Sequence, residues 1–189
     1  PRVEYPDGSA ATTTYTPFGE PASQILGDGS TISFLYDSQQ RLTSRSSTLG
    51  DAVTFTYTAL DQIASAGTAA GTTSYTYGAS GQLATLVHPD GAILEYGYDV
   101  LGRVTTVSTR ESLVATPRTT TYVYDEADNL VEIHEPGGGV TSLVYDAANR
   151  LTGRTLPNGV VSSWTYDVRD RIDAVTHAGP GGIIASFAY

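Results

Sequence analysis

The chain has 189 residues and is acidic, with 20 aspartates and glutamates against ten arginines, no lysine, and a formal net charge of −10. This balance argues against binding to nucleic acid, because phosphate backbones favour clustered lysine and arginine, and against binding to anionic membrane surfaces. No apolar run reaches the roughly 18 residues that a membrane-spanning segment needs. The lack of cysteine excludes a disulfide framework and leaves the compartment open.

A tyrosine recurs about every 21 residues along the whole sequence, which is the mark of a repeat architecture. In most repeats a second aromatic residue stands two positions earlier, so both rings share one face of a β-strand. Segments such as 93–98 are also rich in β-formers. The recurring tyrosines are Tyr15, Tyr36, Tyr57, Tyr77, Tyr98, Tyr124, Tyr145, Tyr166 and Tyr189. Their aromatic partners are Phe34, Phe55, Tyr75, Tyr96, Tyr122, Trp164 and Phe187, while Thr13 and Leu143 take this place in two repeats.

A turn is predicted after each of these strands. In five repeats aspartate follows the tyrosine, and arginine or asparagine stands four residues further on, so a three-residue loop separates the two. Such loops usually form a type I turn and then one residue with positive φ, which favours Gly, Asn or Asp. We expect the aspartate to accept backbone N–H bonds in its own turn and the arginine to form a cross-strand ion pair beside it. The positive-φ place is held by Gly19, Asp61, Gly81, Gly102, Asp128, Asn149 and Asp170, with Gln40 as the exception.

An apolar residue begins each return strand, which ends at a second kind of turn containing Gly after Pro, Asp or Asn. Each repeat is therefore predicted to be two short antiparallel strands, and the chain a meander of roughly eighteen strands. Frequent Gly and Pro leave no room for a competing helical pattern. The apolar residues are Leu42, Ile63, Leu83, Val104, Leu130, Leu151 and Ile172. The second turns are Pro6-Asp7-Gly8, Gly27-Asp28-Gly29, Pro89-Asp90-Gly91, Pro136-Gly137-Gly138 and Pro157-Asn158-Gly159.

The motif Tyr-Asp-x-x-Gly-Arg-Leu, most complete at residues 98–104 and 145–151, resembles the signature of the RHS/YD-repeat family, and the resemblance covers essentially the whole chain. Thr16, Thr58 and Gly78 replace the aspartate in three repeats, which weakens any claim that this aspartate is chemically required. The signature residues are Tyr36, Asp37, Arg41, Tyr98, Asp99, Gly102, Arg103, Tyr124, Asp125, Tyr145, Asp146, Arg150, Tyr166, Asp167 and Arg171.

The resemblance implies an all-β fold, in which a tandem array of YD-repeat β-hairpins forms a curved, spiralling antiparallel sheet like a β-solenoid or shell. We expect a single block over residues 1–189 with about nine repeats, excerpted from a longer array because both ends cut through hairpins. In relatives resembling toxin components, such a sheet encloses an unfolded polypeptide, and an Asp-Pro element marks where a toxic domain is released by autoproteolysis. No Asp-Pro occurs here, so we expect the wall without that protease or a toxin.

Two functions remain open. The first is encapsulation or delivery of a toxic polypeptide by a secreted bacterial protein. The second is an extracellular filament, surface appendage or adhesin that could also bind carbohydrate. Expected partners are flanking YD repeats of the same parent chain or neighbouring subunits, an enclosed cargo polypeptide and, for the second function, surface glycans. The gap between Tyr98 and Tyr124 is longer by five residues and places an insertion at 110–118, interpreted as a long rim turn or a contact loop.

No catalytic, cofactor or metal site is predicted, and we expect no enzyme activity. His88, His134 and His177 stand at similar places in their repeats and could cluster along one rim, but no His-x-x-x-His or carboxylate spacing supports a metal site. No nucleophile elbow supports a Ser-His-Asp triad. The aromatic residues are interpreted as core packing, with cross-strand pairs contributing roughly 0.2–1 kcal/mol each. The alternative is an exposed stripe for sugar stacking.

Overall fold

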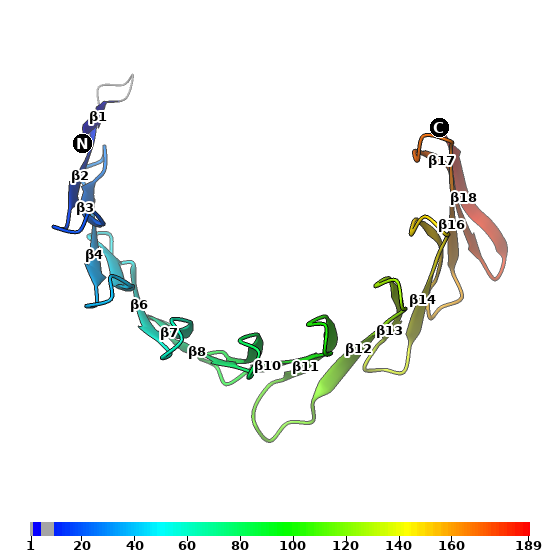
Figure 1. Cartoon of the computed structure of the whole chain (residues 1–189), viewed down its shortest axis with the longest axis horizontal. Coiled ribbons are helices and arrows are strands. Elements are labelled where there is room, and N and C mark those ends of the chain that lie inside the picture. The colour runs from blue at the N-terminus through cyan, green and yellow to red at the C-terminus, as the bar shows by residue number, and fades with distance from the viewer. Residues whose placement is uncertain (1, 5–9) are drawn as a thin grey trace. The chain divides into compact units, whose positions relative to one another are not determined.

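The computed structural model describes residues 2–4 and 10–189, and these residues form β-strands, turns and loops (Figure 1). The chain divides into two compact units, Pro1–Ile93 and Leu94–Tyr189. Within the described ranges, no helix is long and apolar enough to cross a membrane. The predicted all-β fold of tandem hairpins is confirmed, whereas the expectation of one block over residues 1–189 stays a prediction.

The first unit is an antiparallel meander in which each strand pairs with the next along the chain. The turn predicted at residues 6–8 lies outside the described residues. The strands of the first unit are β1 (Arg2–Glu4), β2 (Ala10–Tyr15), β3 (Pro21–Ile25), β4 (Thr31–Tyr36), β5 (Leu42–Ser47), β6 (Ala52–Tyr57), β7 (Ile63–Thr68), β8 (Gly71–Tyr77) and β9 (Leu83–Val87).

The second unit repeats this plan, and its strands from β11 onward also pair in chain order. The predicted insertion is the long connection between β11 and β12, where the backbone N–H of Ala115 donates to the carbonyl of Ser112 at 3.1 Å. The strands are β10 (Ile93–Tyr98), β11 (Val104–Arg110), β12 (Arg118–Tyr124), β13 (Leu130–His134), β14 (Val140–Tyr145), β15 (Leu151–Thr155), β16 (Val161–Tyr166), β17 (Ile172–Gly179) and β18 (Gly182–Ala188).

Seven of the strands that end in a tyrosine meet the return strand at a β-bulge. Tyr36 pairs with Leu42 whereas Leu35 pairs with Ser44, so Thr43 is the extra residue between them. The hydroxyl of Thr43 donates to the carbonyl of Leu35 at 3.2 Å. A bulge of this kind bends the strand and re-aims the side chains next to the turn. The same register shift occurs in β2–β3, β6–β7, β8–β9, β12–β13, β14–β15 and β16–β17.

The last residue of every three-residue loop has positive φ, as the residue type predicts at seven of the eight places. The values lie between 59° at Asn149 and 99° at Gly19. Gln40, whose residue type does not favour this conformation, also adopts it, with φ of 64°. The loop is closed by backbone bonds that fix this geometry: the N–H of Gln40 donates to the carbonyl of Asp37 at 3.0 Å, and Asp37 N–H to the carbonyl of Arg41 at 3.0 Å. The turn therefore imposes the conformation on whatever residue stands there.

The two faces of each unit differ in chemistry. The aromatic face carries the recurring tyrosines, their aromatic partners and the apolar residues of the return strands. Most of these side chains are half-buried, whereas some, such as Tyr15, Phe187 and Tyr189, are exposed. The hydroxyl face carries mainly serine and threonine, which are more exposed in strands such as β6 and β8. Its residues are Thr14, Ser23, Ser33, Ser44, Ser46, Thr54, Thr56, Ser65, Ser74, Thr76 and Thr85 in the first unit, and Thr106, Ser108, Thr119, Thr121, Ser142, Thr155, Ser163, Thr165, Thr176 and Ser186 in the second.

Neither unit has a second layer over its aromatic face among the described residues. Ala11 and Ile93 are the only buried hydrophobic residues there. The accessible area is 12050 Å², whereas a compact monomer of this mass would expose about 8,700 Å². The aromatic rings therefore lie on one face of each unit without being enclosed in a two-layered core, and the core packing expected from the sequence stays a prediction.

Candidate functional site

The aspartate that follows the tyrosine organises its own turn. In the first complete example, Asp37 Oδ1 accepts the backbone N–H of Gln39 at 2.9 Å and that of Arg41 at 3.0 Å. Its Oδ2 accepts the Nε–H of Arg41 at 2.8 Å. One carboxylate thus satisfies two loop donors and fixes the guanidinium. The same set of contacts occurs at Asp99 with Arg103, Asp146 with Arg150, Asp167 with Arg171, and Asp125 with Asn129.

Three of these arginines also reach the following turn. Arg41 Nη1 lies 2.7 Å from Oδ1 of Asp61, which is the positive-φ residue of the next turn. Arg150 Nη1 lies 2.6 Å from Oδ1 of Asp170. Arg103 makes the equivalent ion pair with Asp128. Each guanidinium therefore bridges two carboxylates that belong to successive hairpins.

The tyrosine of the following repeat completes this contact. The guanidinium carbon of Arg150 lies 4.6 Å from the ring centroid of Tyr166, a distance typical of a cation–π interaction. The Tyr166 hydroxyl donates to the carbonyl of Leu151, the residue after Arg150, at 2.7 Å. We call such a set of arginine, next-turn aspartate and next-repeat tyrosine a repeat clamp. The three repeat clamps are Arg41 with Asp61 and Tyr57, Arg103 with Asp128 and Tyr124, and Arg150 with Asp170 and Tyr166.

Repeats without the arginine keep a weaker version of the link. The side-chain amide of Gln62 donates to the backbone carbonyl of Gly81 at 2.7 Å. Asn129 Nδ2 donates to Asn149 Oδ1 at 3.0 Å. In both cases the residue after the loop again bonds the positive-φ residue of the next turn. Tyrosine hydroxyls also bond the preceding return strand, as in Tyr77 to Ile63 at 2.8 Å and Tyr145 to Leu130 at 3.0 Å.

These bonds shift the acid–base behaviour of the turns. The side-chain hydrogen bond from Arg150, together with its backbone N–H, lowers the pKa of Asp146 below its ordinary value. Backbone donation is the leading cause of the lowered pKa of Asp37. The hydrogen bond to Asp146 in turn raises the pKa of Arg150. Desolvation by burial raises the pKa of Tyr36 and of Tyr145. The turns that Asp37 and Asp146 organise therefore favour the ionised form of these two carboxylates.

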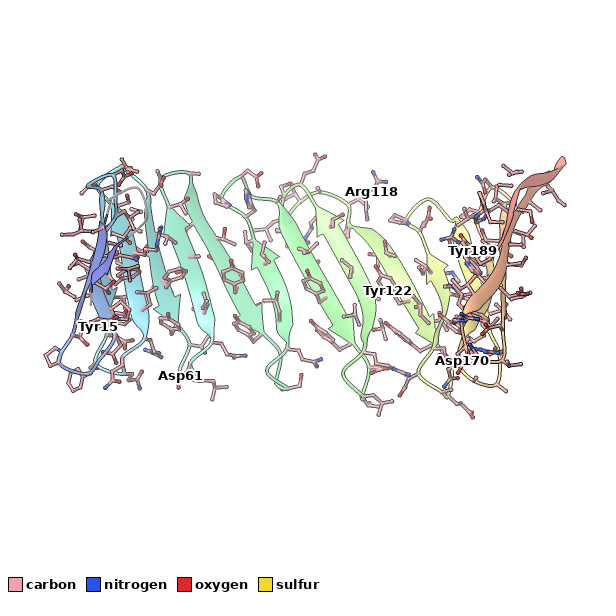
Figure 2. The ribbon with its side chains drawn as sticks, turned by 90° about the horizontal axis from the view of Figure 1, so that it is seen from above. Tyr15, Asp61, Arg118, Tyr122, Asp170 and Tyr189 are labelled. Atoms are coloured by element: carbon pink, nitrogen blue, oxygen red, sulfur yellow. The ribbon has the colours of Figure 1, made fainter. Side chains whose placement is uncertain are left out.

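Figure 2 shows that labelled residues of the second unit lie at different edges of its sheet. Asp170 lies at one long edge, Arg118 lies at the opposite edge, and Tyr122 lies on the sheet between them.

Three other signature residues are not part of a repeat clamp. Arg171 pairs with Asp167 of its own turn, and its side chain is 70% exposed, against 30% for Arg150. Tyr98 stacks on Tyr96 with ring centroids 6.4 Å apart, and Gly102 takes the positive-φ place with φ of 85°.

The inter-repeat half of the clamp was missed by the sequence interpretation, which placed each arginine only within its own hairpin. A signal for it exists in the chain. Aspartate stands at the positive-φ place in the turn after Arg41, Arg103 and Arg150, whereas Gly81 follows Gln62. An arginine after one loop is therefore matched by an aspartate in the next loop, because these two side chains form an ion pair.

The aromatic face of the second unit contains a hollow of about 330 Å³. It is lined by three tyrosine rings and three aliphatic side chains and is almost entirely apolar. This volume suits one apolar side chain of a ligand better than a sugar, whose hydroxyls need several polar partners. The lining residues are Tyr96, Val104, Val107, Tyr122, Tyr124 and Leu130.

The three histidines have three different environments. His88 Nδ1 lies 3.0 Å from Asp90 in a turn, and His134 Nε2 lies 2.8 Å from Glu132 on the same strand. His177 Nδ1 lies 2.9 Å from the hydroxyl of Ser162 on the neighbouring strand. In the described residues, no group of three or more metal-ligating side chains is found.

Comparisons with known proteins follow the repeat pattern. A profile of the family described as RHS Repeat matches residues 36–73, 77–113 and 145–184, which is more than half of the chain. No curated protein sequence matches. The crystal structure of TcdB2-TccC3-TEV is similar, with a TM-score of 0.80 and 16% identity over 95% of this chain and 12% of that chain. The crystal structure of TcdB2-TccC3-Cdc42 gives a TM-score of 0.61 and 14% identity over 93% of this chain and 12% of that chain.

A third similar structure is the Tc holotoxin pore of Photorhabdus luminescens, with a TM-score of 0.62 and 17% identity over 97% of this chain and 10% of that chain. At identities this low, the structural similarity shows a shared fold and nothing more. The chain spans roughly a tenth of the length of the chains to which it is similar.

Proposed function

The chain belongs to the RHS repeat family, and from this premise we propose that its repeats form part of the wall of a secreted bacterial shell that encloses a toxic polypeptide for delivery. The chain itself is a structural repeat scaffold, built from hairpins that bond to one another in register. In the proposed shell, further repeats of the same parent chain flank these hairpins. The small share of the similar chains that this chain covers supports such a longer array.

The observation that carries the proposal is the direction of the side-chain bonds. The bridging arginines each link two successive turns, and the hydroxyls of Tyr57, Tyr124 and Tyr166 link their strands to the preceding return strands. Backbone bonds alone would allow neighbouring hairpins to hinge about their turns. The clamps add a charged and an aromatic contact at one end of each hairpin pair, so they stiffen the sheet along its repeat direction. A wall needs this stiffness.

The uncovered aromatic face is the second support. Half-buried rings line one face of each unit without a covering layer in the described residues. Apolar surface of this kind is stabilised by contact with another apolar surface. In a closed wall, the contents of the shell would provide that contact.

The test is electron microscopy of the native particle formed by the parent protein. The proposal expects closed hollow particles with density inside, and a crosslink from an aromatic-face residue to the enclosed polypeptide. Extended fibres with an axial repeat would overturn it and support the second function, a filament or adhesin. Export into the medium, followed in cell fractions, tests the proposed location separately, because a particle retained in the cytoplasm of undamaged cells would contradict secretion.

A further inference from the structure

Arg154 stands where most repeats carry an aliphatic residue. It is the fourth residue of β15 and pairs across the sheet with Leu143 on one side and Ser162 on the other, on the aromatic face. Arg45 in β5 is its equivalent in the first unit, where it pairs with Phe34. The other repeats have Gln24, Ala66, Leu86, Val107, Ile133 and Val175 at this place. A charge has therefore replaced an apolar contact.

The Arg154 guanidinium has no carboxylate partner among the described residues. Its Nε is buried and lacks a hydrogen-bond partner there. Its one contact of note is the ring of Trp164, whose centroid lies 5.8 Å away. By contrast, Arg150 holds two carboxylates and Arg110 pairs with Glu95 at 2.6 Å. A half-buried cation without a counter-charge is destabilising unless something pairs with it.

Polar residues stand at neighbouring positions of Arg154 on this largely apolar face. Arg154 pairs with Ser162 and Ser162 pairs with His177, so the three form one row across β15, β16 and β17. Ser162 is fully buried, and its hydroxyl lies 2.9 Å from His177 Nδ1. Thr141, two residues before Leu143, is 7% exposed. The row therefore holds a cation and an imidazole on either side of a buried hydroxyl, and a guanidinium and an imidazole are both groups that hydrogen-bond to a carboxylate.

We propose that Arg154 and His177 form a carboxylate-binding site, in which the buried hydroxyl of Ser162 positions the His177 ring, and that its occupant is an acidic side chain of an extended polypeptide lying on the aromatic face. The identity of this polypeptide as enclosed cargo rests on the proposed function, whereas the site itself does not. Trp164 is already stacked with the guanidinium, so its ring is a poor platform for a sugar. The tyrosine-lined hollow on the same face of the same unit accepts apolar side chains. An extended polypeptide could place an apolar side chain in the hollow and an acidic side chain at Arg154.

Trp164 is the only tryptophan in the sequence and lies beside the site, so its fluorescence reports occupancy. The full 189-residue chain is titrated with a synthetic peptide of glycine, leucine and glutamate, at an ionic strength near physiological to screen the acidic net charge. The same peptide with glutamine in place of glutamate is the uncharged control ligand. Glucuronate oligosaccharide and inorganic sulfate are titrated in parallel. We expect the glutamate peptide to bind at least about tenfold more tightly than the glutamine peptide, since a charged hydrogen bond is lost in the latter.

The variant Arg154→Leu restores the kind of residue found in other repeats. It should abolish the preference for glutamate while leaving Tm unchanged or higher, because it removes an unpaired charge. Arg169→Leu removes the same charge from an exposed turn and should leave binding within about twofold of the wild type.

Three results would overturn the site. The first is a fall in Tm for Arg154→Leu with unchanged peptide binding, because that would make the arginine a purely structural partner of Trp164. The second is equal binding of the two peptides. The third is tighter binding of glucuronate or sulfate than of the peptide, which would replace the polypeptide by another anion. None of these depends on whether the parent particle is hollow, so this proposal and the proposed function can fail separately.

Discussion

The side-chain amide of Asn129 donates to the side-chain oxygen of Asn149 at 3.0 Å, in the place where Arg150 meets Asp170 one repeat later. Both members of the usual charged pair are replaced together, and the contact between successive turns is kept. Asn129 also donates to Asp125 in its own turn at 3.1 Å, as Arg150 does to Asp146. The link between hairpins is therefore a property of two positions acting as a pair.

This pair predicts non-additive behaviour. Asn129→Arg alone creates a cation that faces an amide, and Asn149→Asp alone creates a carboxylate that faces an amide. The double variant rebuilds a complete clamp, so its Tm should exceed the sum of the two single effects by roughly 1–3 °C. The check is a double-mutant cycle by thermal unfolding at low and high salt. Additive effects at both salt concentrations would show that the two turns are not coupled.

The arginine that bridges two turns should matter more than the one confined to its own turn. Arg150→Gln removes the ion pairs to Asp146 and Asp170 and the contact with Tyr166. We expect Tm to fall by roughly 2–4 °C. The matched variant Arg171→Gln removes only the pair with Asp167, and its 70% exposed side chain should change Tm by about 1 °C or less. Equal effects would contradict the assignment of stability to the inter-repeat contacts.

Tyrosine hydroxyls should contribute only where they reach the preceding strand. Tyr166→Phe removes the bond to the carbonyl of Leu151 at 2.7 Å and keeps the ring under Arg150. The expected loss is about 1 kcal/mol in the free energy of unfolding, measured in urea. Tyr122→Phe is the control, because its hydroxyl has no hydrogen bond within the described residues. A comparable loss for Tyr122→Phe would mean that the ring environment, and not the bond to Leu151, is responsible.

The imposed positive φ makes two substitutions change stability in opposite directions. Gln40 has φ of 64°, and Gln40→Asn should raise the free energy of unfolding by roughly 0.5 kcal/mol because asparagine tolerates this region better. Asn149 occupies the equivalent place with φ of 59°. Gly102 has φ of 85°, and Gly102→Ala should cost about 1–2 kcal/mol. Urea unfolding of both variants is the measurement, and a destabilised Gln40→Asn would show that the glutamine side chain makes a contribution of its own.

The lowered aspartate pKa values predict loss of stability in acid. The folded-state pKa of Asp146 lies below its ordinary value, chiefly through the side-chain bond from Arg150. Its contribution is therefore fully present above the unfolded pKa near 3.9, and it is lost as the pH falls through the folded pKa. Tm should be nearly constant from pH 7 to about 5 and fall below about 4. Asp146→Asn should be less stable at pH 7 and show a smaller acid-induced fall; an identical pH profile for both proteins would contradict the linkage.

Local chemistry was sufficient to predict the hairpins and their loops. The recurrence of tyrosine, the three-residue loop and the Gly, Asp or Asn at its end specify strand, turn and return strand within each repeat, and the observed φ values confirm the loop geometry. These features follow from the sequence because turn type and strand alternation depend on residues a few positions apart.

Contacts between repeats depended on the tertiary structure. Which turn lies beside which, and at what offset, is set by strand pairing and by the bulge at residues such as Tyr36, so the bond from Arg41 to Asp61 joins residues 20 positions apart. The same holds for the unpaired Arg154, since its pairing with Ser162 and their row with His177 appear only once the strands are in register. The sequence by itself determined the repeating hairpin through short-range turn chemistry, whereas the tertiary structure decided the clamps, the uncovered aromatic face and the cationic row, because these depend on side chains that strand pairing brings together.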